Sequence, residues 1–282
     1  MQLSPKQTRV FQEVVLDYYR KHGRKFPWRK TRDPYAILVS EVMLQQTQAD
    51  RVAPFFVSFL NAFPTVERLA RASLKQVLRV WSGLGYNRRA LFLKRAAEAV
   101  MREHRGVVPR NLAPLDALPG VGRDTASAVL AFAWNERVVF VETNIRTVFL
   151  HHFFPRQRKV RDEEVLELVR QTLPIKTHPF SRRMGESIEI REWYDALMDY
   201  GAMLKHQVGN PNIRSAHYVR QKRFVGSRRE LRGAILRKAS RGEVHVADFA
   251  AFQEKGLPVS EILSELAAEG FLRKEGRGFR TT

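Results

Sequence analysis

The sequence predicts an all-α fold that ends in a small winged-helix-like segment. Apolar residues recur at helical spacing in most segments, as Val10, Val14 and Tyr18 do in the first one, and the loops between these segments are short. After Gly226 the pattern changes to three short helices and a basic hairpin. With 282 residues, of which 44% are hydrophobic, the chain can bury a sizeable core and form about one to three domains.

Charge and cysteine content narrow the classes of function. Lys and Arg number 49 against 29 Asp and Glu, a net charge of +20, which indicates a polyanionic partner: a nucleic acid or an anionic membrane surface. The absence of cysteine excludes disulfides, thiolate zinc sites, cysteine-bound iron–sulfur clusters and cysteine nucleophiles. We expect a cytoplasmic protein, because no stretch resembles a membrane span or a signal peptide.

The first half of the chain predicts a series of helices. Pro34 opens an apolar segment that reaches residue 63, and Pro54 is expected to divide it into two helices. Two short helices should follow, over 65–72 and 73–81, with Ser73 as an N-cap. Longer helices are expected after two glycine-containing turns, over 88–103 and 123–133.

The second half alternates helices with less regular segments. The β-branched stretch 137–142 could be a strand, but no partner strand is nearby, so we expect a buried extended entry into a helix over 144–151. Further helices are expected at 163–173 and 188–204, separated by a polar stretch over 174–185. A basic run, 205–224, leads to the boundary near Gly226, and the last segment predicts helices at 228–239, 246–253 and 259–268 before two short strands.

The strongest local motif is Leu118-Pro-Gly-Val-Gly122 followed by a helix. Its two glycines allow a tight turn whose backbone N–H groups, with the helix dipole, can bind an anion. A simple helix–helix turn is the competing interpretation, and the shorter Gly83-Leu-Gly85 turn shares this ambiguity. Flanked by helices, the longer motif is the hairpin of helix-hairpin-helix proteins, which bind DNA phosphates without reading base sequence. No alternation of strands and helices supports a dinucleotide-binding interpretation.

Taken together, the motifs resemble those of helix-hairpin-helix (HhH-GPD) DNA glycosylases. They are most similar to those of the MutY-type adenine DNA glycosylases. The resemblance runs from about Phe26 to Met203. It rests on the following stretches: Pro27-Trp-Arg29, Asp33-Pro-Tyr35, Ser40-Glu-Val-Met-Leu-Gln-Gln-Thr-Gln48, Trp81-Ser-Gly-Leu-Gly-Tyr86, Leu118-Pro-Gly-Val-Gly-Arg123 and Asp199-Tyr-Gly-Ala-Met203.

The resemblance implies a two-domain core. A six-helix barrel would span about 28–136, and a second helical domain would combine 1–27 with 137–225. The winged-helix-like segment would occupy 226–282. Duplex DNA containing a damaged or mismatched base would be the partner, with the flipped base in the cleft between the two core domains. We expect a monomer on the nucleoid, with no membrane association.

The first expected catalytic residue is Glu41. Hydrolysing a purine N-glycosidic bond needs an acid that protonates the leaving base and a negative charge near the oxocarbenium-like sugar. Glu41 matches the family's general acid, and its apolar neighbours would raise its pKa toward the useful range. Without the resemblance, a surface Glu on an amphipathic helix would be the preferred interpretation.

The second carboxylate departs from the family pattern. The family usually has Asp-Gly-Asn, whereas this chain has Glu142-Thr-Asn144. Glu142 keeps the charge but moves it by roughly 1.5 Å, which could cost activity; a helix N-terminal charge is the alternative role. Asn144 matches a residue that supports the carboxylate or the sugar-phosphate. Asp124 stands where bifunctional relatives have a Schiff-base lysine, so a monofunctional hydrolase is expected; Asp124 would be a second pocket carboxylate or an N-cap.

Other positions are assigned by the resemblance alone. Base flipping needs side chains that fill the stack and others that hold the extruded base. The expected roles are wedge residues Gln46 and Tyr86, base-pocket residues Trp28, Arg29, Leu44 and Asp199, and phosphate-binding residues Gly120, Val121, Gly122 and Arg123. Singly, each has an ordinary structural interpretation, as core or surface.

Two familiar parts of the family are missing. The four cysteines of its iron–sulfur cluster are replaced near Lys205, Asn212, Ser215 and Gln221, so we expect no cofactor beyond a monovalent cation at the hairpin. We expect the basic segment to fold by hydrogen bonding instead. We also expect no counterpart of the family's large C-terminal domain that recognises 8-oxoguanine.

The preferred function is therefore a monofunctional DNA glycosylase that acts on a damaged or mispaired base, with an adenine mispair first. A mismatch thymine or uracil glycosylase shares the same motifs. A catalytically weak damage-binding protein and a transcription regulator are the alternatives outside the enzyme class.

Overall fold

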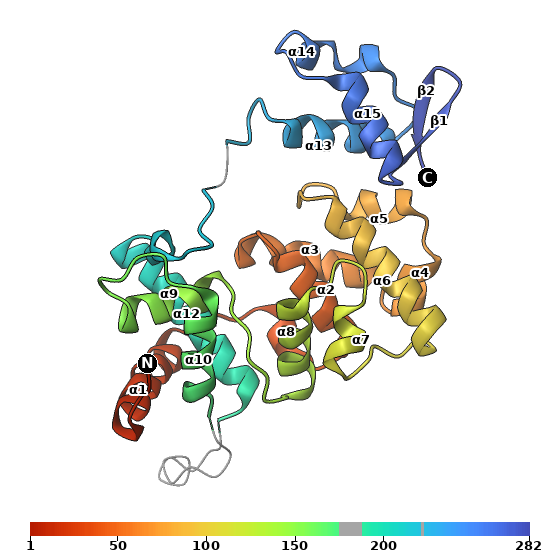
Figure 1. Ribbon diagram of the computed structural model, residues 1–282. Coiled ribbons are helices and arrows are strands. Elements are labelled where there is room, and N and C mark those ends of the chain that lie inside the picture. Colours follow the sequence, from red (N-terminus) through yellow and green to blue (C-terminus); the bar gives the residue numbers. More distant parts are fainter. Residues whose placement is uncertain (175–187, 221–222) are drawn as a thin grey trace. The chain divides into compact units, whose positions relative to one another are not determined.

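A computed structural model describes residues 1–174, 188–220 and 223–282 (Figure 1). Most of the predicted 174–185 stretch lies outside these residues. The helices in the described parts are not long and apolar enough to cross a membrane. The chain divides into two compact units: unit 1 holds 1–37, 110–112 and 122–220, and unit 2 holds 38–109, 113–121 and 221–282.

Unit 1 is built around one long helix, α12 (Ile190–Val208), which packs on α1, α8 and α9. Trp193, Tyr194 and Phe149 are fully buried in its core, because α12 and α9 turn their apolar faces toward each other. The other elements among its described residues are α1 (Pro5–His22), η1 (Pro27–Lys30), α8 (Arg123–Trp134), α9 (Thr143–Phe153), α10 (Asp162–Thr172) and η2 (Pro211–Arg214). Residues 137–142 form an extended entry into α9 without strand pairing, as predicted.

Unit 2 begins with most of α2 (Pro34–Leu44). The helices that follow are α3 (Ala49–Ala62), α4 (Val66–Arg71), α5 (Leu74–Trp81), α6 (Arg88–His104) and α7 (Leu112–Asp116). Ser73 is the N-cap of α5, in a reciprocal capping box with Gln76, which confirms the prediction. α5 and α4 both pack on α6, and Trp81, Phe59 and Leu69 fill the core between them.

The predicted helix break at Pro54 is wrong. Pro54 lies inside α3, near its N-terminal end, where proline removes only one hydrogen bond of the ladder. The chain instead breaks at 45–48, between α2 and α3, where Gln46 adopts a left-handed backbone with φ of 56°. A left-handed residue cannot continue an α-helix, so it ends α2 more effectively than the proline does.

The C-terminal segment contains the predicted helices and hairpin (Figure 1). Its helices are α13 (Arg228–Ala239), η3 (Val246–Phe249), α14 (Ala250–Gln253) and α15 (Val259–Ala268). β1 (Leu272–Glu275) and β2 (Gly278–Thr281) pair antiparallel, with Leu272 opposite Thr281. The segment belongs to unit 2 by its contacts, through α13 on α5, so an independent domain over 226–282 stays a prediction.

Candidate active site

In unit 2, Glu41 and the expected wedge residues lie on or just beyond the end of α2. Glu41 is half-buried in the last turn of that helix, and Leu44 is its final residue. Gln46 is exposed in the break that follows. The residues expected to be the acid, a pocket residue and a wedge residue therefore lie within six positions of one another at one helix end.

A buried arginine, Arg89, fixes this helix end to the Gly83–Tyr86 turn. Its Nη1 donates to the carbonyl oxygens of Val42, Met43 and Gln45 at 3.1, 2.5 and 2.6 Å, and its Nη2 donates to Gly85 at 3.3 Å. These carbonyls are the ones that a helix C-terminus leaves without partners. Burial lowers the pKa of Arg89 to about 10, so the guanidinium stays charged at neutral pH.

Tyr86 and Gln46 are both held in a conformation that L-residues seldom adopt. Tyr86 has a φ of 49° and Gln46 has 56°, and each costs about 1–2 kcal/mol in backbone strain. The Arg89 guanidinium lies over the Tyr86 ring, with its Cζ 5.2 Å from the ring centroid. Such strain persists only where the surroundings impose it, which is typical of functional turns.

The hairpin shows why its first glycine is needed. Gly120 has a φ of +76°, and a Cβ at this position would lie 2.6 Å from the Cβ of Phe92. Gln45 donates to the Gly120 carbonyl at 3.3 Å, so the end of α2 also contacts the hairpin. Val121 is buried, whereas Gly122, the N-cap of α8, and Arg123 are exposed. The first N–H groups of α8 therefore open to the surface, as anion binding requires.

In unit 1, the Glu142 carboxylate caps α9. Its Oε1 accepts hydrogen bonds from the backbone N–H groups of Asn144 and Ile145 at 2.7 and 2.8 Å, and Asn144 Nδ2 donates to Oε2 at 3.3 Å. Glu142 thus has the helix N-terminal role that was the alternative interpretation of this residue. It holds a negative charge at a fixed place, which is also what a sugar-facing carboxylate needs.

Lys205 of α12 joins this group. Its Nζ donates to Asn144 Oδ1 at 2.8 Å. Burial lowers the pKa of Lys205, although the Glu142 charge opposes the shift. The close approach of the two helices depends on Gly201, because a Cβ there would lie 2.2 Å from the Asn144 carbonyl oxygen. Glu142, Asn144 and Lys205 therefore form one connected polar group, the Glu142 cluster.

The segment that replaces the cysteines folds by hydrogen bonding to α9, as predicted. Asn212 Nδ2 donates to Thr147 Oγ1 at 2.7 Å, and Arg214 Nη2 donates to the Leu150 carbonyl at 3.1 Å. Ser215 pairs with Val160 in a short bridge. Gln221 lies outside the described residues. With no cysteine in the chain, an iron–sulfur cluster cannot form.

Asp124 lies in the first turn of α8, and Gly122, not Asp124, is the N-cap of that helix. The Asp124 carboxylate accepts a hydrogen bond from the backbone of Val141, the residue before Glu142. Partial desolvation raises its pKa, although the residue as a whole is exposed. The N-cap alternative is therefore wrong, and a role beside the Glu142 cluster stays a proposal.

Two of the four expected base-pocket residues are paired with each other. Arg29 donates to both carboxylate oxygens of Asp199, at 2.8 and 2.9 Å, and Arg24 donates to Asp199 Oδ1 at 2.7 Å. Burial alone would raise the pKa of Asp199, but Arg29 and Arg24 outweigh it and hold the pKa below its usual range. Trp28 stacks on Phe26 at 4.8 Å and is buried.

A second carboxylate, Asp195, shares Arg29. Its Oδ1 lies 2.8 Å from Arg29 Nε, and burial raises its pKa to about 6 despite the nearby guanidinium. The sequence interpretation missed Asp195, Arg24 and Arg89. The spacing of Asp195 and Asp199, four residues apart on one helix, was the available signal for the first. Arg24 and Arg89 each lie among other basic residues, where nothing in the sequence separates a buried arginine from exposed ones.

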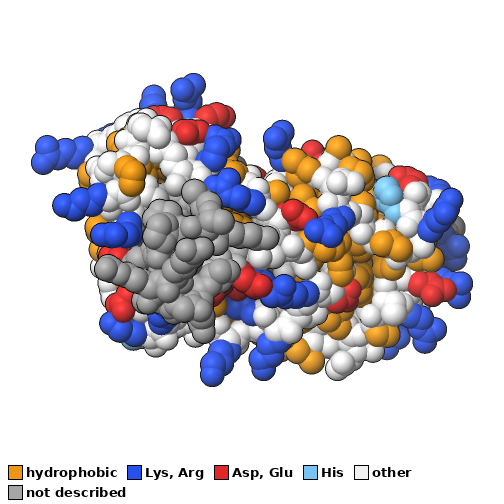
Figure 2. Space-filling view, turned by 90° about the horizontal axis from the view of Figure 1, so that it is seen from below, with side chains coloured by type: hydrophobic (Ala, Val, Ile, Leu, Met, Phe, Trp, Pro, Cys, Tyr) orange, Lys and Arg blue, Asp and Glu red, His pale blue; other side chains and the backbone are white. Residues whose placement is uncertain are grey.

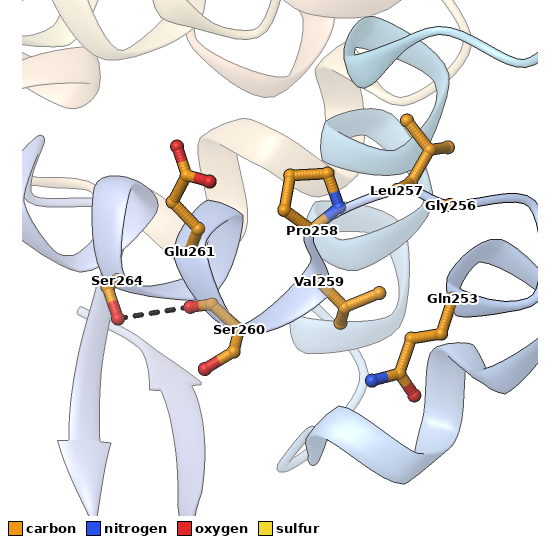
Figure 3. A pocket seen from close by; sticks show the side chains of 8 residues that line it. All are labelled: Gln253, Gly256, Leu257, Pro258, Val259, Ser260, Glu261 and Ser264. Atoms are coloured by element: carbon orange, nitrogen blue, oxygen red, sulfur yellow. Dashed lines mark hydrogen bonds between the residues drawn. The ribbon is translucent and has the colours of Figure 1, made fainter.

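On the face shown in Figure 2, surface charge alone does not single out a binding area. Lys and Arg side chains are spread across the face shown in Figure 2, with Asp and Glu among them. The pocket drawn in Figure 3, at the start of α15, has Glu261 as its one charged lining residue, so it does not suit a phosphate. Its lining residues are Gln253, Gly256, Leu257, Pro258, Val259, Ser260, Glu261 and Ser264.

Comparison with known proteins agrees with this geometry. Residues 39–174, which include Glu41, the hairpin and the Glu142 helix cap, match the model of the HhH-GPD superfamily of base excision DNA repair proteins. This part of the chain belongs to the HhH-GPD superfamily. The resemblance inferred from the motifs is thereby confirmed.

Individual HhH-GPD relatives extend the match. The chain is 31% identical over 198 residues to an adenine DNA glycosylase of Buchnera aphidicola subsp. Baizongia pistaciae, covering 70% of this chain and 53% of that protein. It is 45% identical over 135 residues to an adenine DNA glycosylase of Mycobacterium tuberculosis, covering 48% and 44%. The chain thus spans about half the length of the curated relatives that it matches.

A solved structure of a thermostable thymine-DNA glycosylase is similar to this chain as well. The TM-score is 0.59 at 27% sequence identity, over 70% of this chain and 87% of the other. The mostly helical HhH glycosylase architecture predicted from the sequence is confirmed by this match.

Proposed function

We propose that the protein is a monofunctional DNA glycosylase that hydrolyses the N-glycosidic bond of a damaged or mispaired base in duplex DNA, adenine first. The observation that carries this proposal is that the superfamily match, 39–174, contains the acid, the hairpin and the second carboxylate in one segment. Adenine is preferred because the relatives with 31% and 45% identity bear that specificity in their names.

In the proposed reaction Glu41 protonates the leaving base. General acid catalysis needs a carboxyl group that can donate a proton to the departing base, and Glu41 lies half-buried on α2. Glu142 supplies negative charge to the oxocarbenium-like sugar, since its helix-cap bonds hold the carboxylate in place before substrate arrives. Asn144 orients this carboxylate through its side-chain amide.

The protein is proposed to lack lyase activity. Asp124 occupies the position that the resemblance gives to a Schiff-base lysine, and a carboxylate cannot form an imine. Lys205 is a candidate for a replacement amine, because it lies in the Glu142 cluster and its pKa is lowered. Its hydrogen bond to Asn144 gives it a structural role instead.

A panel of labelled duplexes tests the function. Purified protein should release adenine from a mispair, and the strand should break only after alkali. Glu41→Gln should lower the single-turnover rate by roughly 10²–10⁴ while duplex affinity stays the same, because the amide keeps the shape but cannot donate the proton. Strand cleavage without alkali would contradict the monofunctional assignment, and full activity of Glu41→Gln would contradict the acid.

Thymine mispaired with guanine is the second candidate substrate, favoured by the structural match to a thymine-DNA glycosylase. The same panel separates the two, since a G·T duplex and an adenine mispair differ only in the excised base. Tight binding of a lesion with no excision from any duplex would instead favour a damage-binding protein.

We also propose that 226–282 is a winged-helix-like part of the DNA-binding surface. Three helices followed by a two-stranded hairpin support this proposal, as does the turn Gly276-Arg277 between β1 and β2.

A further inference from the structure

The C-terminal segment reaches the expected wedge turn. Arg229, in the first turn of α13, donates to the Tyr86 hydroxyl at 3.0 Å, and its guanidinium lies 5.9 Å from the Tyr86 ring centroid. Farther along, α13 packs on α5. The C-terminal segment is thus part of the same surface as Gln46 and Tyr86, within unit 2.

Two adjoining pockets lie between this segment and the rest of unit 2. The first is bordered by the Gln45–Gln46 break, the Gly83–Arg89 turn and α13, and the second, the α5–α13 pocket, continues from it through Ser82 and Arg237. No carboxylate lines either pocket. The α5–α13 pocket has a volume of about 450 Å³. Its lining residues are Lys75, Arg79, Ser82, Arg237, Ser240 and Arg241.

The charge of the α5–α13 pocket is not compensated by the protein. In the part of the chain that the structure describes, Lys75, Arg79, Arg237 and Arg241 form no ion pair, and all four are exposed. Arg232, which lines the neighbouring pocket, differs: it pairs with Glu265 and Glu269 at 3.5 and 2.7 Å. The four unpaired positive charges lie together, so they repel one another and raise the electrostatic free energy of the pocket.

Helix capping does not account for this cluster. The C-terminal ends of α5 and α13 both lie here and carry roughly half a negative charge each, about −1 in total against four positive charges. The last carbonyls of α13 already have local partners: Leu236 accepts from the Ser240 N–H, and Lys238 from the N–H of Gly242. A surplus of positive charge remains after both helix ends are counted.

We propose that the α5–α13 pocket binds a backbone phosphate of DNA, so that the C-terminal segment and the superfamily core hold one strand jointly beside the wedge turn. A phosphate supplies the missing negative charge, and the Ser82 hydroxyl offers a neutral donor beside the four cations. The contact positions the duplex and carries no sequence preference. This inference rests on the proposed function for the identity of the polyanion.

The test compares two variants that each remove two positive charges from the full chain. Arg237→Gln/Arg241→Gln removes the α13 side of the pocket, and Lys6→Gln/Arg9→Gln removes exposed charges from α1. Affinity for a labelled duplex is measured by fluorescence anisotropy at several salt concentrations. The pocket variant should reduce the slope of log K against log salt by about 0.9, one phosphate, whereas the α1 variant should leave the slope unchanged.

A second pair tests whether one phosphate is shared. Lys75→Gln/Arg79→Gln should reduce the slope by the same amount, and the fourfold variant should lose no more than either pair does. Equal slopes for wild type and both pocket variants would overturn the proposal. Thermal stabilisation by inorganic phosphate that the pocket variants lose, with unchanged DNA slopes, would assign the pocket to free phosphate and also overturn it.

Excision assays separate this result from the proposed function. If the pocket variants lose slope but wild type excises no base, the phosphate site stands and the glycosylase proposal fails. If wild type excises adenine and all slopes are equal, the glycosylase proposal stands and the phosphate-site proposal fails.

Discussion

At the scale of single residues, Glu142 is the most informative departure from the family pattern. A longer side chain was expected to displace the charge, yet the structure shows a carboxylate held by two backbone N–H groups and by Asn144. Lys205 extends the same group from a neighbouring helix. The surroundings thus hold the glutamate carboxylate in place, and we propose a site rebuilt around glutamate rather than a strained substitute.

Glu142→Asp should therefore lower the single-turnover excision rate about tenfold or more, because shortening moves the charge away from Asn144. Stability should change by less than about 1 kcal/mol, since aspartate is also a good N-cap. Glu142→Gln is the matched control: it keeps the length and removes the charge, so its rate should also fall. The measurements are excision of a mispaired base and the urea midpoint. An Asp variant as fast as wild type would contradict a site fitted to glutamate.

The expected carboxylates, hairpin and wedge positions were assigned from residue identity, because motifs keep them at constant spacing, and their roles stay predictions. Hydrogen-bond partners that come from distant segments of the chain could not be predicted in this way. Nothing near Lys205 in the sequence indicates that it bonds to Asn144, 61 positions away. The pairing depends on Gly201, whose missing Cβ lets two helices touch.

At the scale of elements, the end of α2 shows how packing overrides local preference. Helix periods, caps and the C-terminal hairpin followed from apolar spacing and turn residues, and the structure contains them. The break between α2 and α3 did not follow from the sequence, since Pro54 was the stronger local signal. Arg89 decides it, because its guanidinium satisfies three carbonyls at the end of α2.

Arg89→Met should destabilise the protein by on the order of 3 kcal/mol, because these buried carbonyls lose charged donors. Gln46 and Tyr86 should then lose their fixed conformations, and extrusion of a 2-aminopurine base, read by its fluorescence, should fall. Arg102→Met is the control on the same helix: its side chain is exposed and pairs with Glu103, so the unfolding midpoint should hardly change. Equal midpoints for both variants would show that Arg89 does not hold the turn.

At the scale of the whole molecule, the positive charge is shared between the core and the C-terminal segment. Of the +20 net charge, residues 221–282 contribute +5, from 13 Lys and Arg against 8 Asp and Glu, and residues 1–220 contribute +15. Sequence composition predicts this polyanion preference but not its location. Of the surfaces that could receive phosphates, the α8 N-terminus follows from the local hairpin motif, whereas the α5–α13 pocket arises only when helices from separate segments pack.

Duplex binding should consequently weaken steeply with salt. The hairpin, the Gly83–Gly85 turn and the α5–α13 pocket give at least three expected phosphate contacts, and each adds about 0.9 to the slope of log K against log salt. Raising salt fourfold should then lower affinity by about 40-fold or more. Anisotropy titrations with an undamaged duplex measure this without chemistry, because backbone contacts do not depend on the lesion. An affinity that stays constant over that range would mean that the positive charge serves another partner, and every DNA contact assigned to these surfaces would be wrong.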